Sequence, residues 1–248
     1  MLIEKIPLGT MAYLGAPFQV PDDFCWAWGQ MIQFNSEYVC NPDQYIHLCR
    51  SVTTDRSASR NIMRKLFLGD WLLMLDADQI YQPDLLLRML ILFEGSKLDV
   101  LTGIYNSKNH PYPPMIQWRD DESQYTLAGR VLGNRWRIIT GWRPDVRLIE
   151  VRRAGAGCLM VRRRVFDRID QELGEEPFTN KDGASEDFSF FARLERLGIR
   201  AYAAVRIQLG HLVMRSVSMK NFKPNILDQV MVVDRPEIYV EDAVSTEE

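Results

Sequence analysis

The sequence lacks a long hydrophobic run and a leader pattern. No window reaches the roughly 18 uninterrupted apolar residues that a membrane helix requires. The first residues also lack a basic segment followed by a long apolar stretch. We therefore expect no membrane span and no signal peptide, and we expect a cytoplasmic protein.

Clustered cysteines are absent as well. The four cysteines, Cys25, Cys40, Cys49 and Cys158, are irregularly spaced and form no C-x-x-C pair. This spacing favours neither a zinc ribbon nor a disulfide framework, so a reducing compartment is expected.

The chain also has little net charge. A formal charge of −3 gives no global case for a nucleic-acid or membrane surface. A hydrophobic content of 46% is ordinary for a protein with a proper core. Because no repeat or long linker divides the 248 residues, we expect one domain over residues 1–235 and a flexible acidic tail over 236–248.

Strand-like and helix-like segments alternate over about the first 105 residues, which is typical of a parallel sheet with covering helices. Strands are expected at 6–14, 45–52, 71–75 and 98–106, and helices start near Asp22, Ser57 and Pro83. For the second helix, Ser57 or Ser59 is the expected cap and Gly69 the expected end. Its apolar face should carry Ile62, Met63, Leu66 and Phe67.

The second half has a different pattern. Residues 119–157 suggest antiparallel strands joined by turns, and "CLMVRRRVFDRI" then passes from strand to helix. The amphipathic segment "SEDFSFFARLERLG" predicts a helix that Gly198 ends, and residues 199–212 predict one more strand.

The stretch "WLLMLDADQIYQPD" contains the first candidate site. Asp76, Ala77 and Asp78 directly follow five apolar residues, at the carboxyl end of a buried strand, where ligands bind in open α/β sheets. Two carboxylates so close together suit a hard divalent cation such as Mg²⁺ or Mn²⁺. The alternative is structural, because aspartate is also common in turns and at helix starts.

Three motifs together resemble the GT-A glycosyltransferases, particularly family 2 and its bacteriophage relatives. The segment "SASRNIMRKLFLGDWLLMLDADQ" has an A-R-N-like helix that leads into a strand ending in D-x-D. Much later come "GAGCLMVRR" and then "SEDFSFFARLERLGIRAYAAVRIQLGH", with an acidic pair, a glycine turn, a strand and a histidine in the family's order. The resemblance covers roughly residues 5–215.

This resemblance implies an α/β GT-A fold with a Rossmann-like mixed sheet flanked by helices. Residues 1–105 would form the nucleotide-binding half and residues 106–215 the acceptor and catalytic half. The implied activity is metal-dependent transfer of a sugar from a UDP- or GDP-sugar to an acceptor hydroxyl, with Mn²⁺ or Mg²⁺ and inversion at the anomeric carbon. The first strand lacks the family's usual P-x-Y/N opening, which leaves the nucleotide open.

The resemblance also assigns residues to roles. Asp78 and His211 would bind the metal, and Asp76 would hold the ribose or reach the metal through water. The other donor contacts would come from Ala16, Pro17, Asp55, Arg60 and Ala77. Asp187 would be the catalytic base, and Glu186 would be a second catalytic residue that also contacts the acceptor. Gly157 and Trp142 would lie on the acceptor side.

Other functions stay open at this stage. A local excess of arginines over 130–164, interleaved with Trp136 and Trp142, is compatible with a DNA acceptor, as in phage enzymes that glycosylate modified bases. Carbohydrate and small-molecule acceptors, a retaining enzyme and a non-catalytic binding module are further alternatives. A haloacid dehalogenase-like phosphohydrolase fits poorly, because Gln79 and Ile80 follow the D-x-D motif.

Overall fold

The computed structural model describes residues 8–15, 20–39, 46–108, 112, 114–119, 136–138, 147–180 and 184–212. The predictions for Cys40, for Ala16 and Pro17, for Trp142 and for the tail 236–248 lie outside these residues. None of the described helices is both long and apolar enough to cross a membrane.

Helices and strands follow each other in the predicted order. The helices are α1 (Asp22–Tyr38), α2 (Arg56–Leu66), α3 (Leu85–Gly95), α4 (Arg163–Arg168) with its π-helical extension η1 (Ile169–Leu173), and α5 (Glu186–Arg196). The strands are β1 (Gly9–Gly15), β2 (His47–Val52), β3 (Trp71–Asp76), β4 (Gln79–Ile80), β5 (Val100–Ile104), β6 (Ile116–Arg119), β7 (Trp136–Ile138), β8 (Leu148–Val151), β9 (Arg153–Ala154), β10 (Cys158–Arg162), β11 (Ala201–Gln208) and β12 (Gly210–His211).

Seven strands form the central sheet, in the order β2-β1-β3-β10-β5-β11-β8. β1 is parallel to β2 and β3, and β11 is parallel to β5. β10 lies between β3 and β5 and runs antiparallel to both. The sheet is therefore mixed, as expected, and strand β10 from the second half of the chain joins the strands of the first half.

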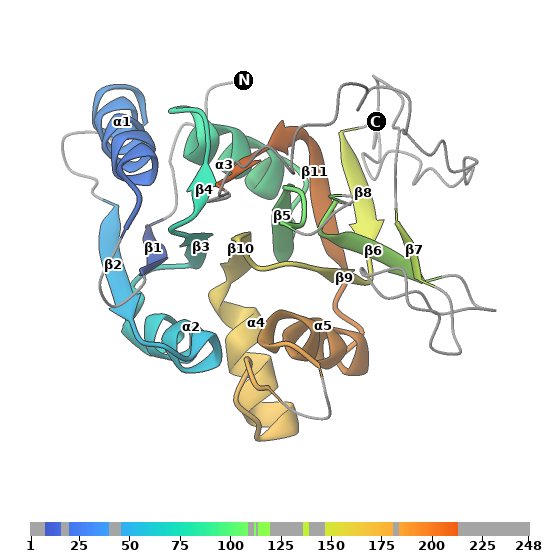
Figure 1. The fold of residues 1–248 in the computed structure, drawn as a ribbon. Coiled ribbons are helices and arrows are strands. Elements are labelled where there is room, and N and C mark those ends of the chain that lie inside the picture. The colour runs from blue at the N-terminus through green and yellow to red at the C-terminus, as the bar shows by residue number, and fades with distance from the viewer. Residues whose placement is uncertain are drawn as a thin grey trace, which may run out of the picture.

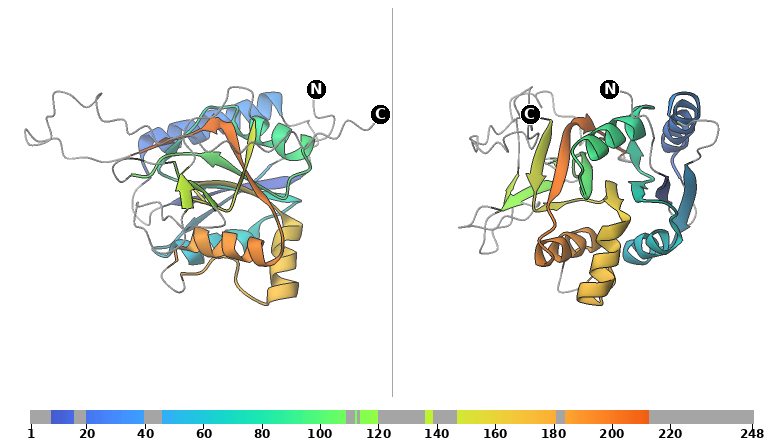
Figure 2. Two further views of the ribbon diagram at one scale, coloured as in Figure 1. Left: turned by 90° about the vertical axis from the view of Figure 1, so that its right-hand side faces the viewer. Right: turned by 180° about the vertical axis from the view of Figure 1, so that it is seen from behind.

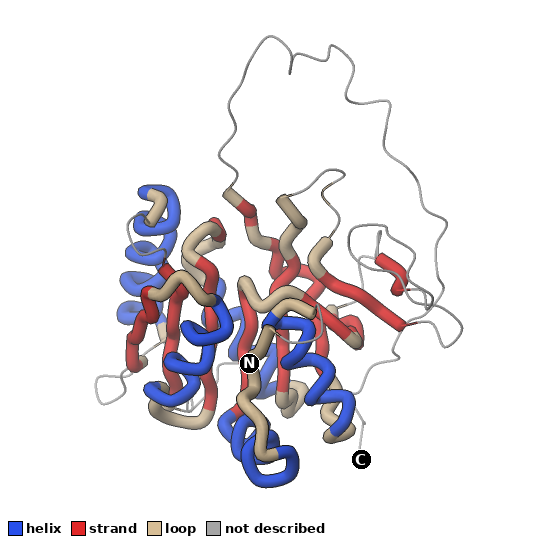
Figure 3. The backbone as a smooth tube through the Cα atoms, turned by 60° about the horizontal axis from the view of Figure 1, so that its bottom comes forward, coloured by secondary structure: helices blue, strands red, loops and turns tan. Residues whose placement is uncertain are grey.

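The helices form a layer on each face of this sheet. α1 and α3 cover one face, while α2, α4 and α5 cover the other (Figures 1 and 2). In Figure 3 the second group lies in front of the strands. Of the other strands, β4 and β12 form a two-stranded sheet. β6, β7 and β9 make a small antiparallel sheet, which agrees with the antiparallel pattern predicted for the middle of the chain.

The apolar run in β3 explains why both layers form. Trp71, Leu73 and Leu75 belong to the hydrophobic cluster with residues of α1 and α3. Leu72 and Met74 point to the opposite cluster, with residues of α2, α4 and α5. A strand buried on both faces needs no polar alternation, so a continuous apolar run fits its place in the sheet.

The prediction for α2 was wrong in detail. Its cap is Asp55, whose carboxylate accepts a hydrogen bond from the Ser57 backbone N–H at 2.9 Å, and the helix ends at Leu66 rather than Gly69. Ile62 and Leu66 are exposed. The buried side of the helix is formed by Ser59, Arg60 and Met63.

Candidate active site at the carboxyl edge of the sheet

The predicted aspartates lie where β3 leaves the sheet. Asp76 is the last residue of β3, and its backbone N–H donates to the Gly157 carbonyl at 3.0 Å. The Ala77 N–H donates to the carbonyl of Leu14, near the end of β1, also at 3.0 Å. These bonds join the ends of β1 and β3 to the segment that enters β10.

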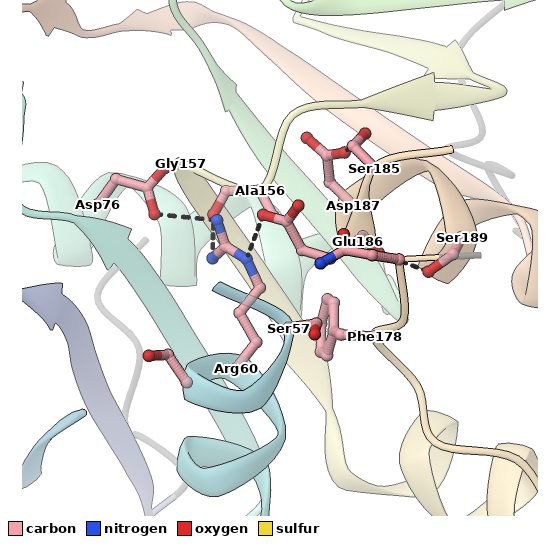
Figure 4. Close-up of polar contacts among 12 residues, drawn as sticks. Ser57, Arg60, Asp76, Ala156, Gly157, Phe178, Ser185, Glu186, Asp187 and Ser189 are labelled. Atoms are coloured by element: carbon pink, nitrogen blue, oxygen red, sulfur yellow. Dashed lines mark hydrogen bonds and ion pairs between the residues drawn. The ribbon is translucent and has the colours of Figure 1, made fainter. Parts of the chain in front are cut away.

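Arg60 links the two predicted acidic motifs. Its side chain is only 1% exposed, and it donates through Nη2 to Asp76 Oδ1 at 2.9 Å and through Nη1 to the Ala156 carbonyl at 2.9 Å. Its Nε lies 3.5 Å from Glu186 Oε1 (Figure 4). Burial favours a lower pKa for Arg60, but the charges of Asp76, Glu186 and Asp187 outweigh burial and raise its pKa.

Asn61, the next residue along α2, holds the segment that leads to α5. Its Nδ2 donates to the Phe178 carbonyl at 2.8 Å, and its Oδ1 accepts from the Phe178 N–H at 3.2 Å. Arg60 and Asn61 thus connect α2 with the start of α5 through side chains. The predicted donor contact of Arg60 stays a prediction, and in this structure its guanidinium faces protein groups.

Glu186 and Asp187 open α5 but point in different directions. The Glu186 carboxylate faces Arg60, whereas that of Asp187 lies beside Ser185 (Figure 4). Asp187 Oδ1 accepts hydrogen bonds from the Ser185 hydroxyl and from the Phe188 N–H. Ser185 therefore precedes the helix as expected, but its hydroxyl contacts Asp187 and makes no capping bond to the backbone.

Sequence reasoning missed Tyr105, which follows β5. Its hydroxyl accepts a hydrogen bond from the Gly157 N–H at 2.9 Å. Burial, and the negative charges of Asp76 and Asp187, raise its pKa, so the phenol remains neutral. A Cβ atom on Gly157 would lie 2.7 Å from the Tyr105 ring, and one on Gly155 would lie 2.1 Å from its hydroxyl. Close approach of Tyr105 thus accounts for both glycines of the G-x-G motif.

Asp78 and His211 meet at the same edge, because β4 pairs with β12 directly after the aspartates. Lys108, also missed from the sequence, lies on the other side of Asp78, with its Nζ 2.5 Å from Oδ2. Burial favours a higher pKa for Asp78, but His211 and Lys108 outweigh it and lower the pKa to about 2. The carboxylate is therefore ionised at neutral pH.

His211 and Asp78 carry atoms of the kinds that could hold a cation. The His211 Nδ1 lies 2.7 Å from the Asn106 carbonyl oxygen, which can only accept, so Nδ1 carries the hydrogen and donates it. In the neutral ring, Nε2 then presents a lone pair 3.5 Å from Asp78 Oδ1. Because the hydrogen of the neutral ring is on Nδ1, Nε2 donates nothing to that oxygen, which is buried without a hydrogen-bond partner among the described residues.

These two side chains fit a divalent cation such as Mn²⁺. A carboxylate oxygen and an imidazole nitrogen that face each other, the latter fixed by a backbone carbonyl, form a common ligand pair. Within the described ranges no group of three or more His, Cys, Asp or Glu side chains is placed to hold a metal ion, so the protein offers two ligand groups here.

Asp55 and the arginine-rich segment have mainly structural contacts in the described chain. Asp55 caps α2 and also lies 3.4 Å from Asn180 Nδ2. Arg162 contacts Glu94 and the Phe93 ring, and Arg163 contacts two carbonyls and the Phe67 ring. Their contacts within the fold give no support to a DNA-binding face in this part of the segment.

We expect Arg60→Met to destabilise the protein strongly. Removing Arg60 leaves two largely buried carboxylates, Asp76 and Glu186, without their counter-charge, which costs about 3 kcal/mol of unfolding free energy. Urea denaturation would measure this loss. Arg164→Met is the matched control, because Arg164 pairs with Asp99 on the surface and should contribute far less. Equal effects of the two substitutions would contradict the linking role of Arg60.

Comparison with known proteins agrees with the fold. Residues 33–170, more than half of the chain, match the family described as glycosyl transferase family 2. A search of curated protein sequences finds no match. Two similar solved structures confirm the GT-A fold.

The first of these structures is A197 from STIV, with 17% identity and a TM-score of 0.53 over 83% of this chain and 86% of that one. The second is GalNAc-T7 with UDP, GalNAc and Mn²⁺, with 10% identity and a TM-score of 0.55 over 90% of this chain. The match spans 46% of the GalNAc-T7 chain. At these identities, the likeness concerns the fold.

Proposed function

The chain belongs to glycosyl transferase family 2, and we propose that it moves a sugar from a nucleoside-diphosphate donor to an acceptor hydroxyl with the help of a divalent cation. The observation that supports this most is the facing pair of Asp78 Oδ1 and His211 Nε2, 3.5 Å apart at the carboxyl edge of the sheet. GalNAc-T7, which shares the fold, was solved with UDP and Mn²⁺.

We propose that Asp78 and His211 hold the cation and that the donor diphosphate lies against it. A cation held there would neutralise the negative charge that grows on the departing diphosphate. Asp78 keeps its charge at neutral pH, and the Asn106 carbonyl keeps the His211 ring in the required tautomer. The ends of β1 and β3 would bind the donor, with Asp76 holding the ribose or reaching the cation through water.

Asp187 is the proposed base. As the acceptor oxygen forms its bond to the anomeric carbon, the bond from that carbon to the diphosphate breaks, and the hydroxyl proton passes to the Asp187 carboxylate. A base that acts opposite the leaving group gives inversion. In this structure the Asp187 carboxylate points away from Arg60 (Figure 4). Asp76 and Glu186 contact the Arg60 guanidinium, and the Asp187 carboxylate therefore stays available to accept a proton.

We propose that Arg60 and Glu186 are positioning residues. The buried Arg60 guanidinium forms ion pairs with Asp76 and with Glu186. It would thereby fix the position of the donor side, which includes Asp76, relative to the base, which follows Glu186. In this account Glu186 orients the first turn of α5, and the acceptor is contacted by Asp187 and its surroundings. The acceptor would be selected by residues at the carboxyl edge of the sheet together with residues outside the described ranges, such as Trp142.

A thermal-shift panel with UDP, GDP and their sugars, each with and without Mn²⁺, tests the proposal. A ligand that binds only the folded state, at a free concentration of a hundred times its Kd, should raise the Tm of the protein by roughly 5 to 10 °C. We expect this rise with one nucleoside diphosphate, and only when Mn²⁺ is present. An equal rise without a divalent cation would contradict the metal-dependent function.

A further inference from the structure

We propose that Lys108 takes the cation's place at Asp78 while the site is free of metal, and that it moves to the donor diphosphate once a divalent cation binds. This inference rests on the proposed function and concerns the same site. It makes Lys108 a positioning and donor-binding residue for the reaction.

The contacts of Asp78 suggest the first half of this proposal. Lys108 Nζ lies 2.5 Å from Asp78 Oδ2, and His211 Nε2 lies 3.5 Å from Oδ1. Both oxygens of the proposed metal ligand therefore face groups of the protein. Of these two groups, the ammonium is a permanent cation near neutral pH, whereas the imidazole is a metal ligand in its neutral form. The structure thus shows Asp78 with a positive charge already beside it.

The backbone next to Lys108 is held in place. The Tyr105 carbonyl accepts a hydrogen bond from the Met115 N–H at 2.8 Å, and Asn106 forms a β-bridge with Pro114. The Asn106 carbonyl also fixes His211. The segment 105–108 therefore both orients His211 and brings Lys108 within reach of Asp78.

The Lys108 side chain is partly exposed to water. It is 40% exposed, and Asp78 is 29% exposed, so water weakens their ion pair. Lysine has a long flexible stem and a compact charge that can turn from one oxygen to another. A divalent cation has twice the charge of the ammonium and can bind both Asp78 and His211. It should therefore displace Lys108 from the carboxylate.

The displaced ammonium then needs an anion. A bare cation at Asp78 would repel Lys108, because like charges at short distance are unfavourable. A nucleoside diphosphate on the cation removes that repulsion and offers phosphate oxygens, which lysine binds as a point charge. Lys108 should therefore oppose binding of the cation alone and favour binding of the donor with its cation, which couples the two events.

Lys108→Met tests this coupling because it should change the affinities for Mn²⁺ and for the nucleotide in opposite directions. Without nucleotide, the variant should bind Mn²⁺ about fivefold more tightly than the wild type, measured by electron paramagnetic resonance of free Mn²⁺. At saturating Mn²⁺, it should bind UDP or GDP about fivefold more weakly, measured by calorimetry. Damage to the fold would weaken both, so the crossed pattern identifies Lys108 itself.

Two further variants complete the experiment. Lys108→Arg keeps the positive charge and should restore nucleotide affinity to near the wild-type value. Lys65→Met removes another exposed lysine that is ion-paired, in this case with Glu176, and should change neither affinity.

The outcomes separate the two proposals. If the wild type binds Mn²⁺ but Lys108→Met binds it no more tightly, the displacement by metal is wrong and the proposed function stands. If nucleotide affinity is unchanged in Lys108→Met, the contact with the diphosphate is wrong. If neither the wild type nor the Lys108 variants bind Mn²⁺, both the metal-dependent function and this inference are wrong.

Discussion

Asp78→Asn is expected to abolish Mn²⁺-dependent binding of the donor. The neutral amide cannot replace a carboxylate whose two oxygens face His211 and Lys108. Because even groups that only orient a metal ligand contribute tenfold to a hundredfold in metal affinity, we expect at least about a hundredfold loss here. Calorimetric titration of the nucleoside diphosphate in the presence of Mn²⁺ measures it.

A surface carboxylate provides the control for this substitution. Asp99 forms an ion pair with Arg164 on the exposed side of the protein, so Asp99→Asn removes the same charge at a distance from the edge of the sheet. It should leave nucleotide binding unchanged, and circular dichroism should show both variants folded. Wild-type affinity in Asp78→Asn would rule out Asp78 as a metal ligand.

The second large effect is expected for Asp187→Asn, which should lower turnover by about a hundredfold to ten-thousandfold. The asparagine oxygen can still accept the hydrogen bonds from Ser185 and the Phe188 N–H, so the first turn of α5 should persist. What is lost is the ability to take a proton. Release of nucleoside diphosphate from the donor measures turnover, and calorimetry should give unchanged Mn²⁺-dependent nucleotide binding.

Glu186→Gln distinguishes the base from its neighbour. Glu186 contacts the buried Arg60, so neutralising it should lower stability, measured by urea denaturation, more than it lowers turnover. If Asp187→Asn keeps normal turnover while Glu186→Gln loses it, the roles of the two acids must be exchanged.

The sequence predicted the elements well where burial depends on a continuous or periodic apolar pattern. β3 and α5 both begin and end close to the expected residues. In α2 the pattern misled, because Ile62 and Leu66 look like core residues but are exposed, whereas Arg60 looks like a surface residue but is buried. Local periodicity does not reveal a buried charge, since its counter-charges lie on β3 and α5, far away in sequence.

The candidate site was predictable to the extent that it consists of motifs. Asp76, Asp78, Glu186, Asp187 and His211 were singled out in advance, and the structure brings them to one edge of the sheet. Tyr105 and Lys108 belong to no motif. Their place at this edge comes from tertiary contacts with Gly157 and Asp78, and the one advance signal was their position just after the buried strand β5.

A crystal structure with Mn²⁺ and the nucleoside diphosphate selected by the thermal-shift panel would show whether Asp78 and His211 hold the cation. We expect an anomalous Mn²⁺ peak within ligand distance of Asp78 and His211, in contact with oxygens of the diphosphate. A Mn²⁺ peak at another place, or a diphosphate bound away from these two residues, would contradict this assignment.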